Sequence, residues 1–135
     1  MRELGSDQMN LDFSPIGKKT KQTVDLMDEV IRSLGTKVLE HVDASLVQDV
    51  ENPDTGRRGM SADQVLRMAL IKQMYTLSYR DLQARVEDSI LLRRFAGYEF
   101  TWVPSPSALQ ANIKAIDADT WEEINTALVK VAVKP

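Results

Sequence analysis

The sequence contains no cysteine among its 135 residues. This absence excludes disulfides and cysteine-ligated metal sites, and it is compatible with a reducing compartment such as the cytosol. No apolar run approaches the roughly 20 residues that a helix needs to span a bilayer, and residues 1–17 lack the apolar segment of a signal peptide. We therefore expect a soluble, cytoplasmic protein without a membrane partner.

Residues that carry catalytic chemistry are also scarce. His41 is the only histidine, and a single helical histidine without a partner is a poor candidate for a catalytic base. The carboxylate pairs Glu87–Asp88 and Glu122–Glu123 are sequence neighbours, which point about 100° apart on a helix and do not share a metal ion. The sequence has no glycine-rich phosphate loop, no zinc-ligand spacing and no nucleophile elbow. We expect no enzyme activity in this chain, no cofactor and no metal.

Charge is present in ordinary amount but is unevenly distributed. The net charge is −3. Residues 1–56 carry 6 basic and 11 acidic side chains, residues 95–135 carry 3 and 5, and residues 57–94 carry 8 and 4. A local positive excess in an acidic protein favours a nucleic-acid ligand for that part of the chain. The alternative is a mixed surface whose local excess has no function.

The apolar content of 43% is enough for one domain with its own core. Residues 1–19 show no periodicity and are predicted to be a flexible lead-in. Apolar residues then recur at helical spacing, which predicts a helical pair over residues 20–51 with Gly35 as a stop between the two helices. Residues 52–56 are rich in turn formers and predict a break.

The next helix begins at Ser61, where Gln64 completes the pattern of a capping box. This helix is apolar nearly all round, which predicts a place in the centre of the core or at a shared interface. Further helices are expected to start at Ser78 with Asp81, at Asp88 or Ser89 with an end near Gly97, at Ser107 with an end near Ile116, and at Asp119 with Glu122.

The predicted fold class is therefore all-α. We expect a compact multi-helix bundle of about seven helices, forming a single domain over residues 20–135. Short helices joined by tight turns make residues 57–116 resemble a helix-turn-helix core. A last helix is predicted over residues 119–133.

Several short runs within residues 56–116 occur in a characteristic order. They are Gly56-Arg57-Arg58-Gly59, Val65-Leu66-Arg67-Met68-Ala69-Leu70, Leu77-Ser78-Tyr79-Arg80-Asp81-Leu82, Asp88-Ser89, Arg94-Phe95 with Gly97, and Val103-Pro104 before Ser107-Ala108-Leu109. In this order they resemble the N-terminal region of DDE-type insertion-sequence transposases. The resemblance implies binding to the terminal repeats of a mobile element, and pairing of protomers. In such enzymes a ribonuclease-H-like catalytic domain with three metal-binding carboxylates follows, and we expect that domain to be absent here.

Arginines in the basic segment are the expected phosphate contacts, because they fix register on DNA and give affinity its salt dependence. They are Arg57, Arg58, Arg67, Arg80, Arg85, Arg93 and Arg94. The alternative for each is an ion pair on the helix surface, as between Arg85 and Asp81 at a spacing of four. About half of the seven are expected to be structural.

Base reading is expected from residues 107–116. Glutamine and asparagine can bond adenine through two hydrogen bonds, and the expected contacts are Ser107, Gln110, Asn112 and Lys114. Relatives often carry arginine on this helix, so the sequence departs from the pattern here. The alternatives are a polar connecting helix packed through its isoleucines and leucine, and base reading by the helix that starts at Ser78.

The aromatic residues Tyr79, Trp102 and Trp121 are expected in the core or at its boundary, without base stacking. The expected partners are double-stranded DNA of the element ends and a second copy of the chain. Two other functions remain open. One is an interaction or dimerisation module that uses the apolar helices 61–77 and 119–133, and the other is a stand-alone helix-turn-helix regulator.

Overall fold

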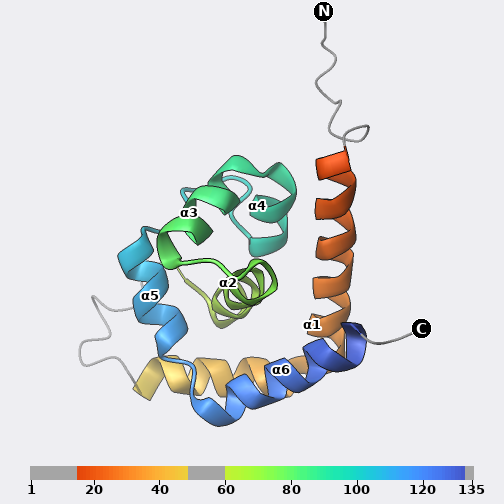
Figure 1. Ribbon diagram of the computed structural model, residues 1–135. Coiled ribbons are helices and arrows are strands. Elements are labelled where there is room, and N and C mark those ends of the chain that lie inside the picture. Colours follow the sequence, from red (N-terminus) through yellow and green to blue (C-terminus); the bar gives the residue numbers. More distant parts are fainter. Residues whose placement is uncertain (1–14, 49–59, 133–135) are drawn as a thin grey trace, which may run out of the picture.

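The computed structural model describes residues 15–48 and 60–132, and helices dominate both ranges (Figure 1). The helices are α1 (Pro15–Gln48), α2 (Ala62–Tyr75), α3 (Tyr79–Asp88), α4 (Ile90–Ala96), α5 (Pro106–Lys114) and α6 (Ala118–Ala132). No strand occurs in these two ranges, which confirms the all-α prediction. Six labelled helices stand against the expected seven or so, because α1 holds both of the first two expected helices, divided at Gly35.

Helix α1 starts at Pro15, so residues 15–19 of the expected lead-in are helical. The predicted stop at Gly35 is a bend: its φ of 74° and ψ of −174° are not helical, and they lie in a region that is essentially restricted to glycine. The helix resumes at once in a new direction (Figure 1). Gly35 therefore divides α1 into two segments that pack on different parts of the molecule.

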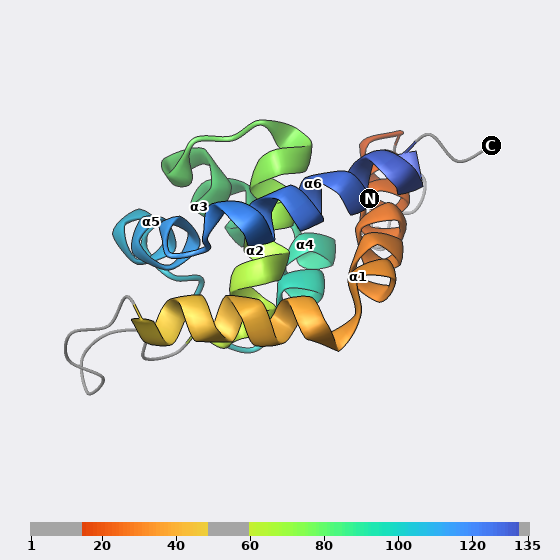
Figure 2. The same ribbon diagram turned by 90° about the horizontal axis from the view of Figure 1, so that it is seen from below.

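Helix α2 lies in the centre of the bundle (Figures 1 and 2). Its buried side chains are Val65, Leu66, Met68, Ala69, Leu70 and Ile71, and it contacts α1, α3, α4 and α5. The predicted capping box is confirmed, since Gln64 N donates to Ser61 Oγ at 3.1 Å and Ser61 N donates to Gln64 Oε1 at 3.0 Å. The rest of the chain therefore covers most of the apolar surface of α2.

Helix α6 runs antiparallel to the second segment of α1 (Figure 2). Ile124 and Val131 are buried in this contact. Polar groups join the two helices as well, through His41 Nδ1 and Glu123 at 3.5 Å and through Ser45 Oγ, which donates to Asp117 at 3.4 Å. These two residues of the predicted apolar stripe are thus buried within the chain itself.

The start of α6 corrects one capping prediction. Thr120 N donates to Asp117 Oδ1 at 2.8 Å, so Asp117 caps the helix and the expected cap Asp119 lies in its first turn. The hydrogen bonds of Asp117 to Thr120 hold the pKa of its carboxyl below the ordinary value of 3.8, with smaller contributions from Ser45 and the nearby His41.

In the described ranges, no helix combines the length and the apolar character that crossing a membrane requires. Two of the sequence predictions concern residues 49–59, between the two described ranges. The break predicted over residues 52–56 and the basic pair Arg57 and Arg58 lie outside the described residues.

Candidate nucleic-acid interface

Helix α5 begins two residues earlier than its sequence suggested. Ala108 N donates to Ser105 Oγ at 3.2 Å, and Pro106 occupies the first helical position. Proline suits that position because its fixed φ is helical and the missing N–H would have no partner there. The prediction that Ser107 caps the helix is therefore wrong. Ser107 lies in the first turn and is exposed.

One side of α5 is polar and open to solvent. Its exposed residues are Ser107, Gln110, Ala111 and Lys114. Their spacings of three, one and three place them on a single face of the helix. The α5 sequence contains no acidic residue. We call these four residues the polar stripe of α5, and they include three of the four side chains predicted to read bases.

Asn112, the fourth predicted reading residue, lies on the opposite side of α5. Its side chain is 4% exposed, and its Nδ2 donates to the carbonyl oxygen of Ala108 at 2.8 Å. Leu109 and Ile113 are buried on the same side. The amide of Asn112 therefore lies inside the protein, away from the polar stripe that holds the other three predicted contacts.

Helix α3 is the other candidate for base reading. Leu82 and Val86 are buried, and the exposed side carries Arg80 and Arg85 together with the carboxylates of Asp81, Glu87 and Asp88. Ser78 caps it as predicted, by accepting from Asp81 N at 3.1 Å. Its exposed surface is thus more acidic than that of α5.

The side chain of Arg67 forms several contacts inside the domain. Its Nε donates to both carboxylate oxygens of Asp63 at 3.0 and 3.1 Å, and Nη1 donates to the carbonyl oxygen of Phe95 at 3.1 Å. The guanidinium also lies 4.8 Å from the centre of the Phe95 ring and 3.5 Å from Asp28. Arg67 therefore joins α1, α2 and α4, and these contacts compete with its predicted phosphate contact.

Three other arginines that were predicted to contact phosphates form fewer contacts within the domain than Arg67. Arg85 lies over the ring of Tyr75 at 4.4 Å and forms no ion pair with Asp81. Arg93 donates to the carbonyl oxygen of Thr101 at 2.8 Å, and Arg94 pairs with Glu99 at 3.1 Å. Arg80 is exposed and makes no ion pair within residues 15–48 and 60–132. Arg80 is thus the arginine of the described set with the fewest competing contacts.

The segment between α4 and α5 exposes two aromatic side chains. Phe100 is 90% exposed and Trp102 is 89% exposed. The prediction that Trp102 lies in the core or at its boundary is wrong, whereas Tyr79 and Trp121 do pack against the core. Tyr98 in the same segment is buried, and burial raises the pKa of Tyr98 to about 12. Its phenol therefore stays neutral at physiological pH.

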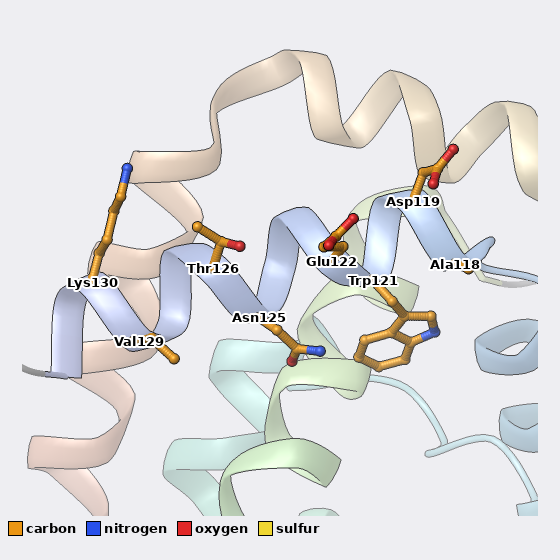
Figure 3. A pocket seen from close by; sticks show the side chains of 8 residues that line it. All are labelled: Ala118, Asp119, Trp121, Glu122, Asn125, Thr126, Val129 and Lys130. Carbon is orange, nitrogen blue, oxygen red and sulfur yellow. The ribbon is translucent and has the colours of Figure 1, made fainter.

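The two grooves on the described part of the chain do not resemble a small-molecule binding site. Figure 3 shows that all eight side chains lining the larger groove come from α6 alone. A second, smaller groove lies between α1 and α6. Ligand sites usually enclose most of the ligand with converging polar groups, which one helix face cannot provide. In the same residues, no group of three or more histidine, cysteine or carboxylate side chains is placed to hold a metal ion.

Comparison with known families places these features in context. Residues 18–115 match the family model described as "Transposase domain (DUF772)", and this range covers most of the chain. The chain belongs to this family. The transposase domain is the N-terminal region of insertion-sequence transposases, so the resemblance inferred from the sequence is confirmed. No match was found to a curated protein or to a solved structure.

The matched range of the transposase domain begins inside α1 and ends just after α5. Helix α6 follows the matched range but packs on α1 as part of the same bundle. The comparisons identify no catalytic domain in this chain.

Proposed function

We propose that this transposase domain binds double-stranded DNA at the ends of its insertion element, with α5 as the helix that enters a groove. The polar stripe of α5 is the observation that carries the proposal. Gln110 has the hydrogen-bonding groups to recognise adenine, and Lys114 has those to recognise guanine or a phosphate. An α-helix with its side chains is about 10–12 Å across, which suits the width of a major groove, about 12 Å.

Charge favours α5 over α3 for this role. DNA presents a dense row of negative phosphates on both sides of each groove. The exposed carboxylates of α3 would be repelled there, whereas α5 brings no carboxylate of its own and one lysine. Asp117 and Asp119 lie beyond the C-terminal end of α5. We therefore assign base reading to the N-terminal half of α5, which holds Ser107 and Gln110, and a phosphate contact to Lys114 at its C-terminal end.

The surrounding helices support a helix-turn-helix-like arrangement. Helices α2 and α3 are separated by Thr76, Leu77 and Ser78, and Thr76 adopts a left-handed conformation with φ 54°. Turns of three or four residues of this kind join the two helices of the motif. Helix α5 packs against both helices that this turn joins, since it contacts α2 and α3.

Phosphate contacts are assigned to cations that border this surface. Arg80 is the first choice, because it is exposed on α3, which packs against α5, and makes no ion pair among the described residues. Arg57 and Arg58 remain predicted phosphate contacts. Arg85, Arg93 and Arg94 each have one contact within the domain, described above, so we expect smaller contributions from them.

Fluorescence anisotropy with two duplexes tests base reading. One duplex carries the inverted repeat that flanks the gene, and the other carries the same bases in shuffled order. We expect Gln110→Ala to weaken binding to the repeat by about tenfold, the usual cost of a lost bidentate base contact, and to leave the shuffled duplex unaffected. The matched control is Gln22→Ala, which removes an exposed glutamine from α1. Equal affinity of both variants and the wild type would exclude α5 as the reading helix.

Salt titration tests the phosphate contact. Each neutralised phosphate contributes about 0.9 to the slope of log K against log salt concentration. We expect Arg80→Ala to lower that slope by about one phosphate contact on both duplexes, without changing the preference for the repeat. An unchanged slope would remove Arg80 from the interface. Absence of any binding at low salt would overturn the proposed function itself.

A further inference from the structure

Phe100 and Trp102 form an exposed aromatic pair that the core does not use. Each ring of this kind can remove about 150–250 Å² from water when it is buried. Here both are about nine-tenths exposed, although two other residues of the same segment, Tyr98 and Val103, are buried at 2% and 7%. The segment between α4 and α5 therefore places some apolar side chains in the core and presents these two to solvent.

The backbone that carries the pair is held at several points. Gln64 Nε2 donates to the carbonyl oxygen of Gly97 at 3.2 Å, and Tyr98 N donates to the carbonyl oxygen of Arg93 at 2.8 Å. Arg93 Nη2 donates to the carbonyl oxygen of Thr101, between the two rings, at 2.8 Å. Ser105 then caps α5. The two rings are thus exposed on a folded segment whose ends are held by hydrogen bonds.

The chemistry around the pair fits nucleic-acid bases. A ring that is nine-tenths exposed has both faces open, and base stacking needs an open face. Arg93 and Arg94 lie at the end of α4 beside this segment, and Glu99, the one acid within it, is already paired with Arg94. Aromatic rings next to arginines are the usual combination for binding unpaired bases with their phosphates.

We propose that Phe100 and Trp102 stack on unpaired or unstacked bases of the DNA that the domain binds. This inference rests on the proposed function for its location, because the aromatic segment leads directly into Ser105 and the N-terminal end of α5 that we assign to DNA. Fully paired DNA offers the pair no open base face. The ligand class is therefore DNA with locally separated strands, as at an opened or distorted element end.

Intrinsic fluorescence of the full chain tests the stacking directly. Trp102 and Trp121 are the two tryptophans, so a Trp121→Phe background makes the emission report on Trp102. The probes are a thymidine oligonucleotide of about eight nucleotides, the fully paired repeat duplex, and the same duplex with a short mismatched bubble. We expect saturable quenching by the oligonucleotide and by the bubble, and tighter binding of the bubble than of the paired duplex.

The double variant Phe100→Ala, Trp102→Ala measures the contribution of the pair. Because both side chains are exposed, folding is expected to be unchanged, and circular dichroism checks this. We expect a loss of about tenfold or more in affinity for the bubble and the oligonucleotide, with the paired duplex unaffected. Ile90→Ala is the matched control, since Ile90 is another exposed apolar residue, on α4.

The outcomes separate this inference from the proposed function. Binding of the paired repeat without any preference for the bubble would overturn the stacking and leave the DNA-binding role intact. Quenching by the oligonucleotide without binding of the paired duplex would support the stacking and overturn the role of α5. If the double variant altered the molecular mass in light scattering and left every DNA affinity unchanged, the pair would be a protein contact and the inference would be wrong.

Discussion

Helices α2 and α5 differ in how much of their surface the rest of the chain covers. Helix α2 has six buried residues and packs against α1, α3, α4 and α5. Helix α5 has three buried residues and an open polar stripe. Their cations differ in the same way, because Arg67 on α2 has several partners while Lys114 on α5 has no ion pair among the described residues. Stability should therefore depend on α2, and ligand binding on α5.

The largest effect expected from this comparison is the loss of a core side chain in α2. Leu66 is fully buried, and Leu66→Ala should lower the free energy of unfolding by about 3 kcal/mol, from lost burial plus the cavity that remains. Urea denaturation measures the change. Gln110→Ala on the stripe of α5 is the control and should stay within about 0.5 kcal/mol of the wild type. Equal losses in the two variants would refute the division of roles.

A smaller loss is expected at Arg67. Arg67→Ala removes a doubly hydrogen-bonded carboxylate contact and leaves the Phe95 carbonyl without its donor, which should cost about 2 kcal/mol of unfolding free energy. Arg80→Ala removes an equally charged side chain that has no such partners. It should leave stability nearly unchanged and reduce DNA affinity instead. If the two variants gave the opposite pattern, the assignment of structural and DNA-binding arginines would be wrong.

The two serines beside Pro106 give a matched pair on α5. Ser105→Ala deletes the capping oxygen at Ala108 N and should cost about 1 kcal/mol. Ser107→Ala keeps the cap and should have no measurable effect on stability, because Ser107 is an exposed first-turn residue. Thermal denaturation of both variants decides the point. A larger loss at Ser107 would restore the capping scheme expected from the sequence.

The smallest effect concerns Asp117, which caps α6 just after α5. The pKa of this carboxyl is lower in the folded protein than its ordinary value of 3.8. Its contribution to stability is therefore complete above that pH and is lost as the pH falls through the folded-state pKa. In urea titrations at neutral and acidic pH, Asp117→Asn should lose less stability on acidification than the wild type. Identical pH profiles would show that the charge of Asp117 contributes nothing.

Much of the fold could be predicted because its determinants are local. The capping serines Ser61 and Ser78 and the stop at Gly97 lie where the sequence placed them, and Ser89 is the cap out of the two residues, Asp88 and Ser89, that the sequence allowed. The apolar character of α2 on all sides predicted its central place. The cap of α5 was missed although a signal was present, since proline at the first helical position indicates that the preceding residue, Ser105, is the cap.

The candidate site was predicted less completely, and the reasons are physical. Asn112 shares the angular sector of Leu109 and Ile113, so helical periodicity alone could have placed it inside. Arg67 stands on a helix surrounded by protein, where a cation needs partners, but Asp28 and the Phe95 carbonyl come from distant segments. The exposure of Trp102 depends on how an irregular segment is held between α4 and α5. No local sequence pattern predicts this exposure, because aromatic residues are usually buried.

The bend at Gly35 has a consequence for how the domain tolerates mutation. Gly35 is exposed, and a Cβ added there would meet no atom within 4 Å. Ordinarily such a position accepts almost any residue. Here the backbone angles alone exclude residues other than glycine. The same angles set the direction of the second segment of α1, which packs against α6. In a saturation mutagenesis library, substitutions of Gly35 should therefore be lost after selection as often as substitutions of a core residue. The contacts of Gly35 alone would suggest an exposed position that tolerates substitution.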